Sequence, residues 1–123
     1  MAMDFTRYKQ LNDEKPNAGP IEGATVKAEY INGGCGDGYT LYLVLDQGRI
    51  TKASYTTTGC GFGVAALETV VSLVKGLSLE QAAALTPQDI DRAFEFPEKR
   101  KNYPQSAWEA LQEALKAARA LPA

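Results

Sequence analysis

The chain has 123 residues, of which 45% are hydrophobic and 23% are charged, and its formal net charge is −2 at pH 7. This length predicts one domain with its own core, and the composition excludes a repetitive or low-complexity protein. A pI near 5.1 argues against nucleic acid as the main ligand, because phosphate binding needs clustered Lys and Arg. The sequence has no apolar run of roughly 20 residues and no signal-peptide pattern at its start, so we expect a cytoplasmic protein without a membrane span.

The residue inventory restricts the available chemistry. Histidine is absent, which excludes Ser-His and Cys-His catalysis and removes the commonest metal ligand. Two cysteines in a reducing compartment are more often thiols or metal ligands than a disulfide. The two cysteines are therefore the main candidates for function.

The first 23 residues are polar and are punctuated by proline and glycine. This pattern predicts a flexible N-terminal arm over 1–23, with no more than a short helical turn over 5–11. Residues 24–121 are predicted to form a single domain.

Three strands are expected at the start of this domain. Polar and apolar residues alternate over 24–31, which predicts a half-buried strand. Residues 39–46 are apolar on both faces, which is typical of a central strand. Residues 50–57 are β-branched and aromatic, and the short turn before them predicts an antiparallel hairpin with the central strand.

Helices are expected over the rest of the chain. Apolar residues at three- and four-residue spacing predict a helix with one buried face over 61–75, closed by Gly76. A capping-box pattern opens a short helix over 79–85, and Pro87 takes the first position of another. Helical spacing of alanine and leucine predicts a last helix over 104–121. Strands precede helices, so we expect an α+β domain with a small three-stranded antiparallel sheet covered by helices.

Both cysteines lie in glycine-rich stretches around the predicted hairpin. Cys35 precedes the central strand and Cys60 follows the third strand, so the hairpin is expected to bring them to one end of the sheet. Asp37 adds a carboxylate, and the start of a helix favours a thiolate at Cys60. These three residues would supply three ligands for Zn or Fe, one fewer than a closed tetrahedral site needs. Two alternatives stay open: glycines that only form turns around a small buried cysteine, or a disulfide.

Several motifs in order resemble the family of iron-sulfur cluster assembly scaffolds known as IscU, SufU or the NifU N-terminal domain. They are Cys35-Gly36-Asp37, Thr58-Gly59-Cys60-Gly61, Val74-Lys75-Gly76-Leu77-Ser78-Leu79-Glu80 and Pro87-Gln88-Asp89-Ile90. The similarity covers about 16–115. It implies the SufE/NifU-like (IscU-like) architecture over 24–121. It also implies that Cys35, Asp37 and Cys60 hold zinc, iron or a transient iron-sulfur cluster, with a cysteine desulfurase and iron-sulfur acceptor proteins as partners.

The chain departs from the family pattern at two places. Tyr103 stands where the third cysteine ligand belongs, preceded by Asn102 in place of His or Lys, and the family's N-terminal motif is reduced over 13–19. A phenol is a poor substitute for a thiolate, which favours a packing or capping role for Tyr103 over ligation.

Two hypotheses follow from the resemblance and its gaps, and neither is an enzyme. The first is a scaffold or carrier that holds metal on Cys35, Asp37 and Cys60, completed by water, a partner's cysteine or a second protomer of a homo-oligomer. The second is a degenerate scaffold paralogue that acts as a non-catalytic binding or regulatory module.

Overall fold

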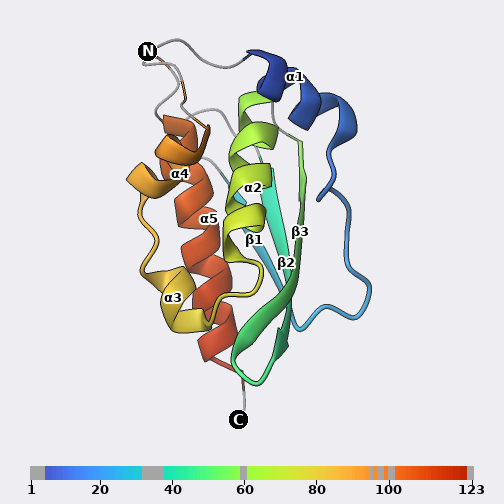
Figure 1. The fold of residues 1–123 in the computed structure, drawn as a ribbon. Helices are drawn as coiled ribbons and strands as arrows, with labels where there is room; N and C mark the ends of the chain where they lie inside the picture. Colours follow the sequence, from blue (N-terminus) through green and yellow to red (C-terminus); the bar gives the residue numbers. More distant parts are fainter. Residues whose placement is uncertain are drawn as a thin grey trace.

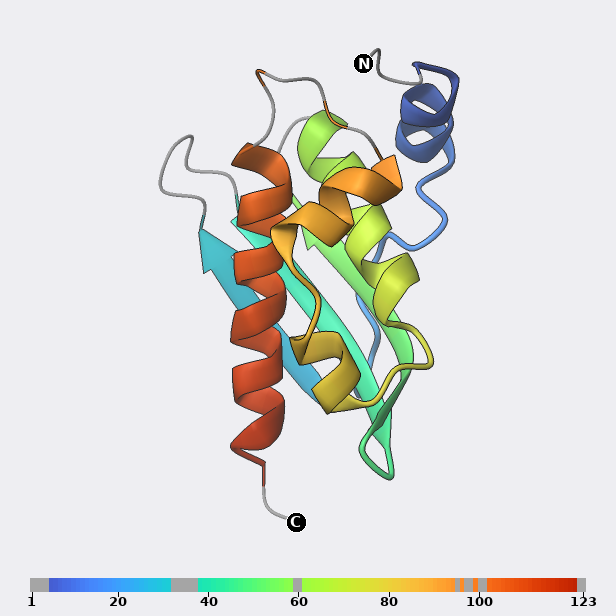
Figure 2. The same ribbon diagram turned by 60° about the vertical axis from the view of Figure 1, so that its left-hand side comes forward.

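A computed structural model describes residues 5–31, 38–58, 61–94, 96, 99 and 102–121. In chain order the elements are α1 (Phe5–Glu14), β1 (Val26–Ile31), β2 (Gly38–Asp46), β3 (Arg49–Thr57), α2 (Gly61–Val74), α3 (Leu79–Ala83), α4 (Pro87–Phe94) and α5 (Asn102–Arg119) (Figure 1). The described helices pack mainly on one face of a single sheet, with α5 lying along β1 and β2 (Figure 2). The predicted α+β class is confirmed. In the described part of the chain, no helix is long and apolar enough to cross a membrane.

The sheet has the order β1-β2-β3, and both pairs of neighbouring strands are antiparallel. The predicted central strand is therefore confirmed. In the register, Leu43 of β2 lies between Val26 of β1 and Ala53 of β3, and all three side chains are buried. Gln47 and Gly48 form the β2–β3 turn with φ of 52° and 77°, the left-handed backbone that a tight hairpin requires.

The helix α2 differs from its prediction. An amphipathic helix with one buried face was expected, but every residue over 63–71 is buried. The reason is that α2 packs on β3, α5, α4 and α1 at the same time. Its central position makes α2 the element that holds the two layers together.

The N-terminal segment forms more structure than the expected turn. The helix α1 has ten residues, packs on α2 and buries Leu11. Beyond it, Ala18 forms an isolated parallel bridge with Tyr55 of β3, and Gly19 N–H donates to the Tyr55 carbonyl at 2.8 Å. These contacts dock the described part of 1–23 on the domain, while its flexibility and the boundary at 23/24 stay predictions.

The helix boundaries follow their local signals. Gly76, with φ of 86°, lies just beyond the end of α2, and Pro87 is the first residue of α4. The capping box before α3 is present: the Ser78 hydroxyl accepts from Gln81 N–H, and the Gln81 side chain accepts from Ser78 N–H.

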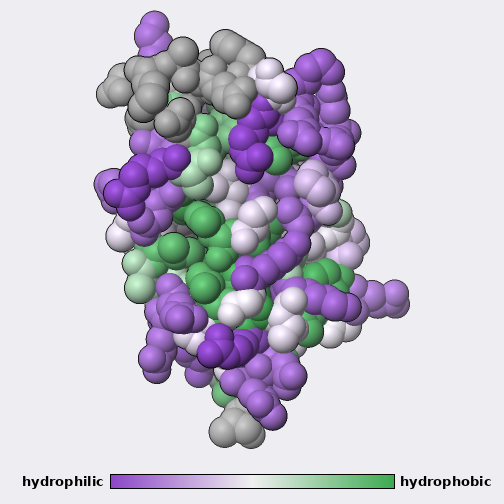
Figure 3. Space-filling view, in the orientation of Figure 1, coloured by the Kyte–Doolittle hydropathy of each residue, from purple (hydrophilic) through white to green (hydrophobic). Residues whose placement is uncertain are grey.

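Figure 3 shows apolar surface between α2, α3 and α4, surrounded by polar residues.

Candidate metal centre

The end of β1, the start of β2 and the end of β3 lie at the same end of the sheet. Ile31, the last residue of β1, lies directly opposite Gly38, the first residue of β2. The Gly38 N–H donates to Thr58 Oγ1 at 3.0 Å, and the Thr58 N–H donates to the Gly38 carbonyl at 3.2 Å. Thr57 Oγ1 also donates to that carbonyl at 2.9 Å. The residue after Asp37 and the residue two positions before Cys60 are thus hydrogen-bonded to each other.

The predicted ligands themselves, Cys35, Asp37 and Cys60, lie outside the described residues. Their ligation of metal, and the alternatives of a turn or a disulfide, stay predictions. Within the described ranges, no group of three His, Cys, Asp or Glu side chains could hold a metal ion.

The first turn of α2 is held by α1. The Asn12 side-chain amide donates to the Gly61 carbonyl at 3.1 Å and to the Tyr8 carbonyl at 3.0 Å. Gly61 leaves room for Tyr8 here, because a Cβ would lie 2.8 Å from Tyr8 Cζ and closer still to its hydroxyl. The sequence analysis assigned this glycine to the Cys60 motif and missed its role in admitting Tyr8.

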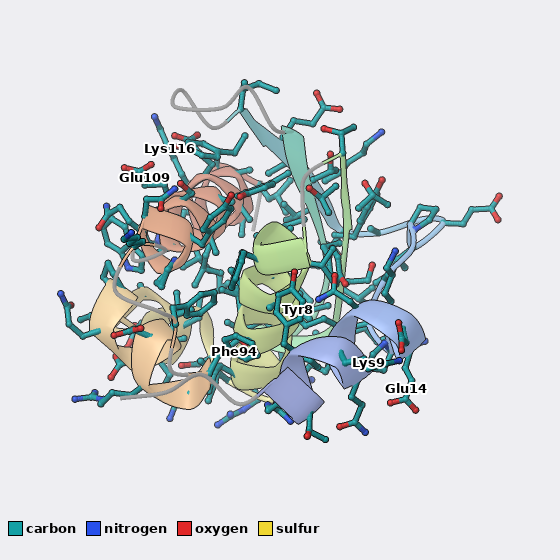
Figure 4. All side chains as sticks on the ribbon, turned by 90° about the horizontal axis from the view of Figure 1, so that it is seen from above. Tyr8, Lys9, Glu14, Phe94, Glu109 and Lys116 are labelled. Atoms are coloured by element: carbon teal, nitrogen blue, oxygen red, sulfur yellow. The ribbon has the colours of Figure 1, made fainter. Side chains whose placement is uncertain are left out.

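An aromatic cluster of five residues lines the same end of the molecule. Its members are Tyr8, Phe62, Phe94, Phe96 and Tyr103. The Tyr8 and Phe62 rings are 4.9 Å apart, Phe62 and Tyr103 5.7 Å, and Phe94 and Phe96 4.8 Å. Figure 4 shows Tyr8 and Phe94 in the space between α1, α2 and α4. Tyr103, which the sequence analysis aligned with the family's third cysteine, thus contacts Phe62, the residue two positions after Cys60.

A buried carboxylate in the middle of α2 was also missed by the sequence analysis. Glu68 is 1% exposed, and it accepts from the Tyr55 hydroxyl at 2.8 Å. It also accepts from Asn17 N–H at 3.0 Å and from the Asn17 amide at 2.8 Å. Burial and the Glu68 carboxylate raise the pKa of Tyr55. The side-chain oxygen Oδ1 of Asn17 accepts from Lys75 Nζ in turn, so this cluster joins the N-terminal segment to both layers.

The face of the sheet away from the helices carries a groove next to these junctions. Its volume is about 280 Å³, and its lining includes Glu29, Ile31, Thr40, Thr56 and Thr58. Ile31 contributes an exposed apolar side chain to this lining. The groove adjoins Gly38, the residue that follows Asp37.

An antiparallel three-stranded sheet with helices packed mainly on one face places the chain in the class of small α+β domains. The chain belongs to the NifU-like N terminal domain family, whose sequence profile matches residues 10–121. It is 35% identical over 102 residues to the nitrogen fixation protein NifU of Cereibacter sphaeroides. That alignment covers 82% of this chain but only 42% of the relative's length.

Solved structures agree with this family. One is a crystal structure described as an iron-sulfur cluster assembly scaffold for the SUF system, from Fervidobacterium islandicum AW-1, with a TM-score of 0.68 and 25% identity. The match covers 88% of this chain and 93% of that one. The N-terminal part of a nitrogen-fixing NifU-like protein from Brucella abortus has the same fold, with a TM-score of 0.65, 17% identity and 90% coverage of both chains.

Proposed function

We propose that this protein is an iron-sulfur scaffold that binds iron, zinc or a nascent cluster through Cys35, Asp37 and Cys60. The observation that carries the proposal is the pair of backbone-to-threonine and backbone-to-backbone hydrogen bonds between Gly38 and Thr58. These bonds join Gly38, which follows Asp37, to Thr58, which lies two residues before Cys60, and this supports a shared site. Family membership supports the same chemistry.

The proposed donor set fits a soft or borderline metal incompletely. Two thiolates and one carboxylate suit zinc and iron, but they leave a fourth position for water, a partner's cysteine or a second protomer. Metal is therefore expected to bind more weakly than in a three-cysteine relative, because water replaces a thiolate poorly. By family resemblance, sulfur comes from a cysteine desulfurase, and the cluster passes to acceptor proteins in the cytoplasm without turnover chemistry by the scaffold.

A second candidate function is a non-catalytic binding or regulatory module on the same fold. It is favoured by the packing of Tyr103 on Phe62, which gives this tyrosine a structural role where the family's third thiolate belongs. Metal analysis of protein purified under reducing conditions separates the candidates. Stoichiometric zinc or iron that is lost in Cys35→Ser and Cys60→Ser supports the scaffold, whereas metal-free protein supports the module.

Replacing Asp37 tests its role as a ligand. In relatives the aspartate is thought to keep the cluster labile, but here it would be one of only three ligands, so Asp37→Ala is expected to weaken metal binding. The measurement is the melting temperature with zinc and with chelator. Loss of only the zinc-dependent increment supports ligation, equal loss in both conditions supports a turn-forming role, and a larger increment contradicts the prediction. Asp46→Ala, an exposed aspartate at the opposite end of β2, is the matched control.

Restoring the missing thiolate tests the alignment of Tyr103. If this first-turn residue of α5 faces the metal, Tyr103→Cys should tighten zinc binding in a chelator competition. Unchanged affinity would show that the third-cysteine position, or the site itself, is misplaced. Tyr103→Phe keeps the ring packing against Phe62 and serves as the control.

A further inference from the structure

The sheet has one strand edge with no strand beside it. Within the described residues, β1 pairs only with β2, so its other edge presents backbone N–H and C=O groups without a strand partner. The opposite edge of the sheet, β3, is partly covered by the bridge between Ala18 and Tyr55. An uncovered edge is a template for pairing with another strand.

The side chains of β1 form a pattern that is complementary to itself. Lys27 and Glu29 are exposed on the face away from the helices, on either side of Ala28. In an antiparallel pair related by a two-fold axis at Ala28, Lys27 of each copy lies directly opposite Glu29 of the other. A two-fold axis at Lys27 or at Glu29 would instead place like charges opposite each other. A shift of one residue in the pairing would turn the two helix layers to opposite faces.

The same register also suits the inner face of the strand. It places Tyr30 opposite Val26 of the second copy, which is a favourable aromatic and β-branched cross-strand pair. Tyr30 is half-buried, and its hydroxyl donates to the Glu109 carboxylate on α5. This bond holds the ring in place before any partner arrives.

The helix α5 carries acidic and basic side chains that can face each other across the same two-fold axis. Glu109 reaches β1, and Lys116, two helical turns further on, lies on the same side of α5 (Figure 4). A two-fold axis at Ala28 makes the α5 helices of the two copies antiparallel. Glu109 of one helix is then directed toward the end of the other helix that carries Lys116 and Arg119.

We propose that a second copy of this chain pairs edge to edge with β1, in the antiparallel register centred on Ala28, and joins the two sheets into one. The occupant is a second copy because Lys27 and Glu29 of β1 complement the same two residues of a symmetry mate. This pairing uses none of the proposed metal ligands, so it does not depend on the proposed function.

A charge-swap experiment tests the pairing. The association state of the full chain is measured by sedimentation equilibrium with reductant and chelator, so that any dimer bridged by metal is dissolved. The parent is expected to dimerise, and Lys27→Glu or Glu29→Lys is expected to weaken dimerisation by roughly ten-fold or more, because two attractive pairs become repulsive. An equal mixture of the two variants is expected to form a heterodimer, since a strand with two acidic side chains would then face a strand with two basic ones. The double variant Lys27→Glu/Glu29→Lys is expected to restore the dimer.

Exposed residues elsewhere provide matched controls. Lys52→Glu on β3 and Glu14→Lys at the end of α1 make the same charge changes away from the β1 edge, and they should leave the association constant unchanged. A monomeric parent would overturn the proposal. So would single variants that dimerise as well as the parent, or a mixture that does not recover the dimer. Circular dichroism confirms that each variant is folded, and a variant that has lost its fold is replaced by Lys27→Gln or Glu29→Gln, for which a smaller loss of association is expected.

Discussion

Gly61→Ala should displace α1 from the first turn of α2. The new methyl group would lie 2.8 Å from Tyr8 Cζ and 3.0 Å from Asn12 Oδ1, and closer still to the Tyr8 hydroxyl. Side chains do not tolerate such approaches, so Tyr8 must leave its position on α2. Its ring contact with Phe62, at 4.9 Å, would be weakened at the same time.

The change in the free energy of unfolding is the sum of two destabilising contributions and one stabilising contribution. Overpacking of this kind costs about 1–3 kcal/mol. Loss of the hydrogen bond from Asn12 to the Gly61 carbonyl costs about 1 kcal/mol more. Gly61 is the first residue of α2, so alanine returns less than the roughly 0.5–1 kcal/mol by which it exceeds glycine in a helix interior. The free energy of unfolding should therefore fall by about 1–3 kcal/mol.

Urea unfolding of the parent, Gly61→Ala, Tyr8→Ala and the double variant forms a double-mutant cycle. Once the Tyr8 ring is removed the clash is gone, so Gly61→Ala should be neutral or slightly stabilising in that background. Gly63→Ala is the control, because its new methyl group meets Tyr39 only at 3.3 Å and needs a small shift. An equal loss of stability with and without Tyr8, or no loss in the parent background, would refute the reasoning.

Three further predictions concern single contacts. Tyr55→Phe should lower the free energy of unfolding by about 1.5–3 kcal/mol, because the buried Glu68 carboxylate loses a donor; unchanged urea unfolding would contradict this. The hydrogen bond from Thr86 N–H holds the pKa of Asp89 below its usual value, so its stabilisation is present above the unfolded pKa of about 3.9 and is lost as the pH falls through the folded value. The melting temperature of Asp89→Asn should therefore lie below that of the parent at neutral pH and converge with it in acid, and a constant gap would exclude this cause. Ser78→Ala should cost about 1 kcal/mol in urea unfolding by removing the cap of α3, whereas Ser78→Thr should keep most of it.

The buried cluster around Glu68 gives the N-terminal segment a defined anchor. Asn17 donates to Glu68 from both its backbone and its side chain, and Tyr55 donates to the same carboxylate. A buried carboxylate without these donors would be costly, so the segment and the core stabilise each other.

Local patterns in the sequence were sufficient for most of the sheet and for the helix ends. The period of two in β1 and the apolar run of β2 correctly indicated one half-buried and one central strand. Gly76, Ser78 and Pro87 marked helix boundaries because their backbone and capping preferences act over only a few residues. For the candidate site, the hairpin predicted that Cys35 and Cys60 lie at the same end of the sheet. This stays a prediction, and the hydrogen bonds between the nearby residues Gly38 and Thr58 support it. Ligation by Cys35, Asp37 and Cys60 is a matter for the metal-binding experiments.

The tertiary structure decided the features that depend on contacts between distant residues. Asn12 and Gly61 are 49 positions apart, and Asn17 and Glu68 are 51 apart, so no local periodicity records either pair. The polar composition of 1–23 predicted no more than a short helical turn over 5–11, and it could not reveal that a glycine in α2 leaves room for Tyr8. Burial of α2 on nearly all sides was hidden for the same reason, because Glu68 and Thr69 have the composition of an exposed face until their partners are known. The sequence by itself determined the local geometry of strands and helix caps. Only packing in three dimensions determined which polar residues are buried and at which glycine another side chain packs against the backbone.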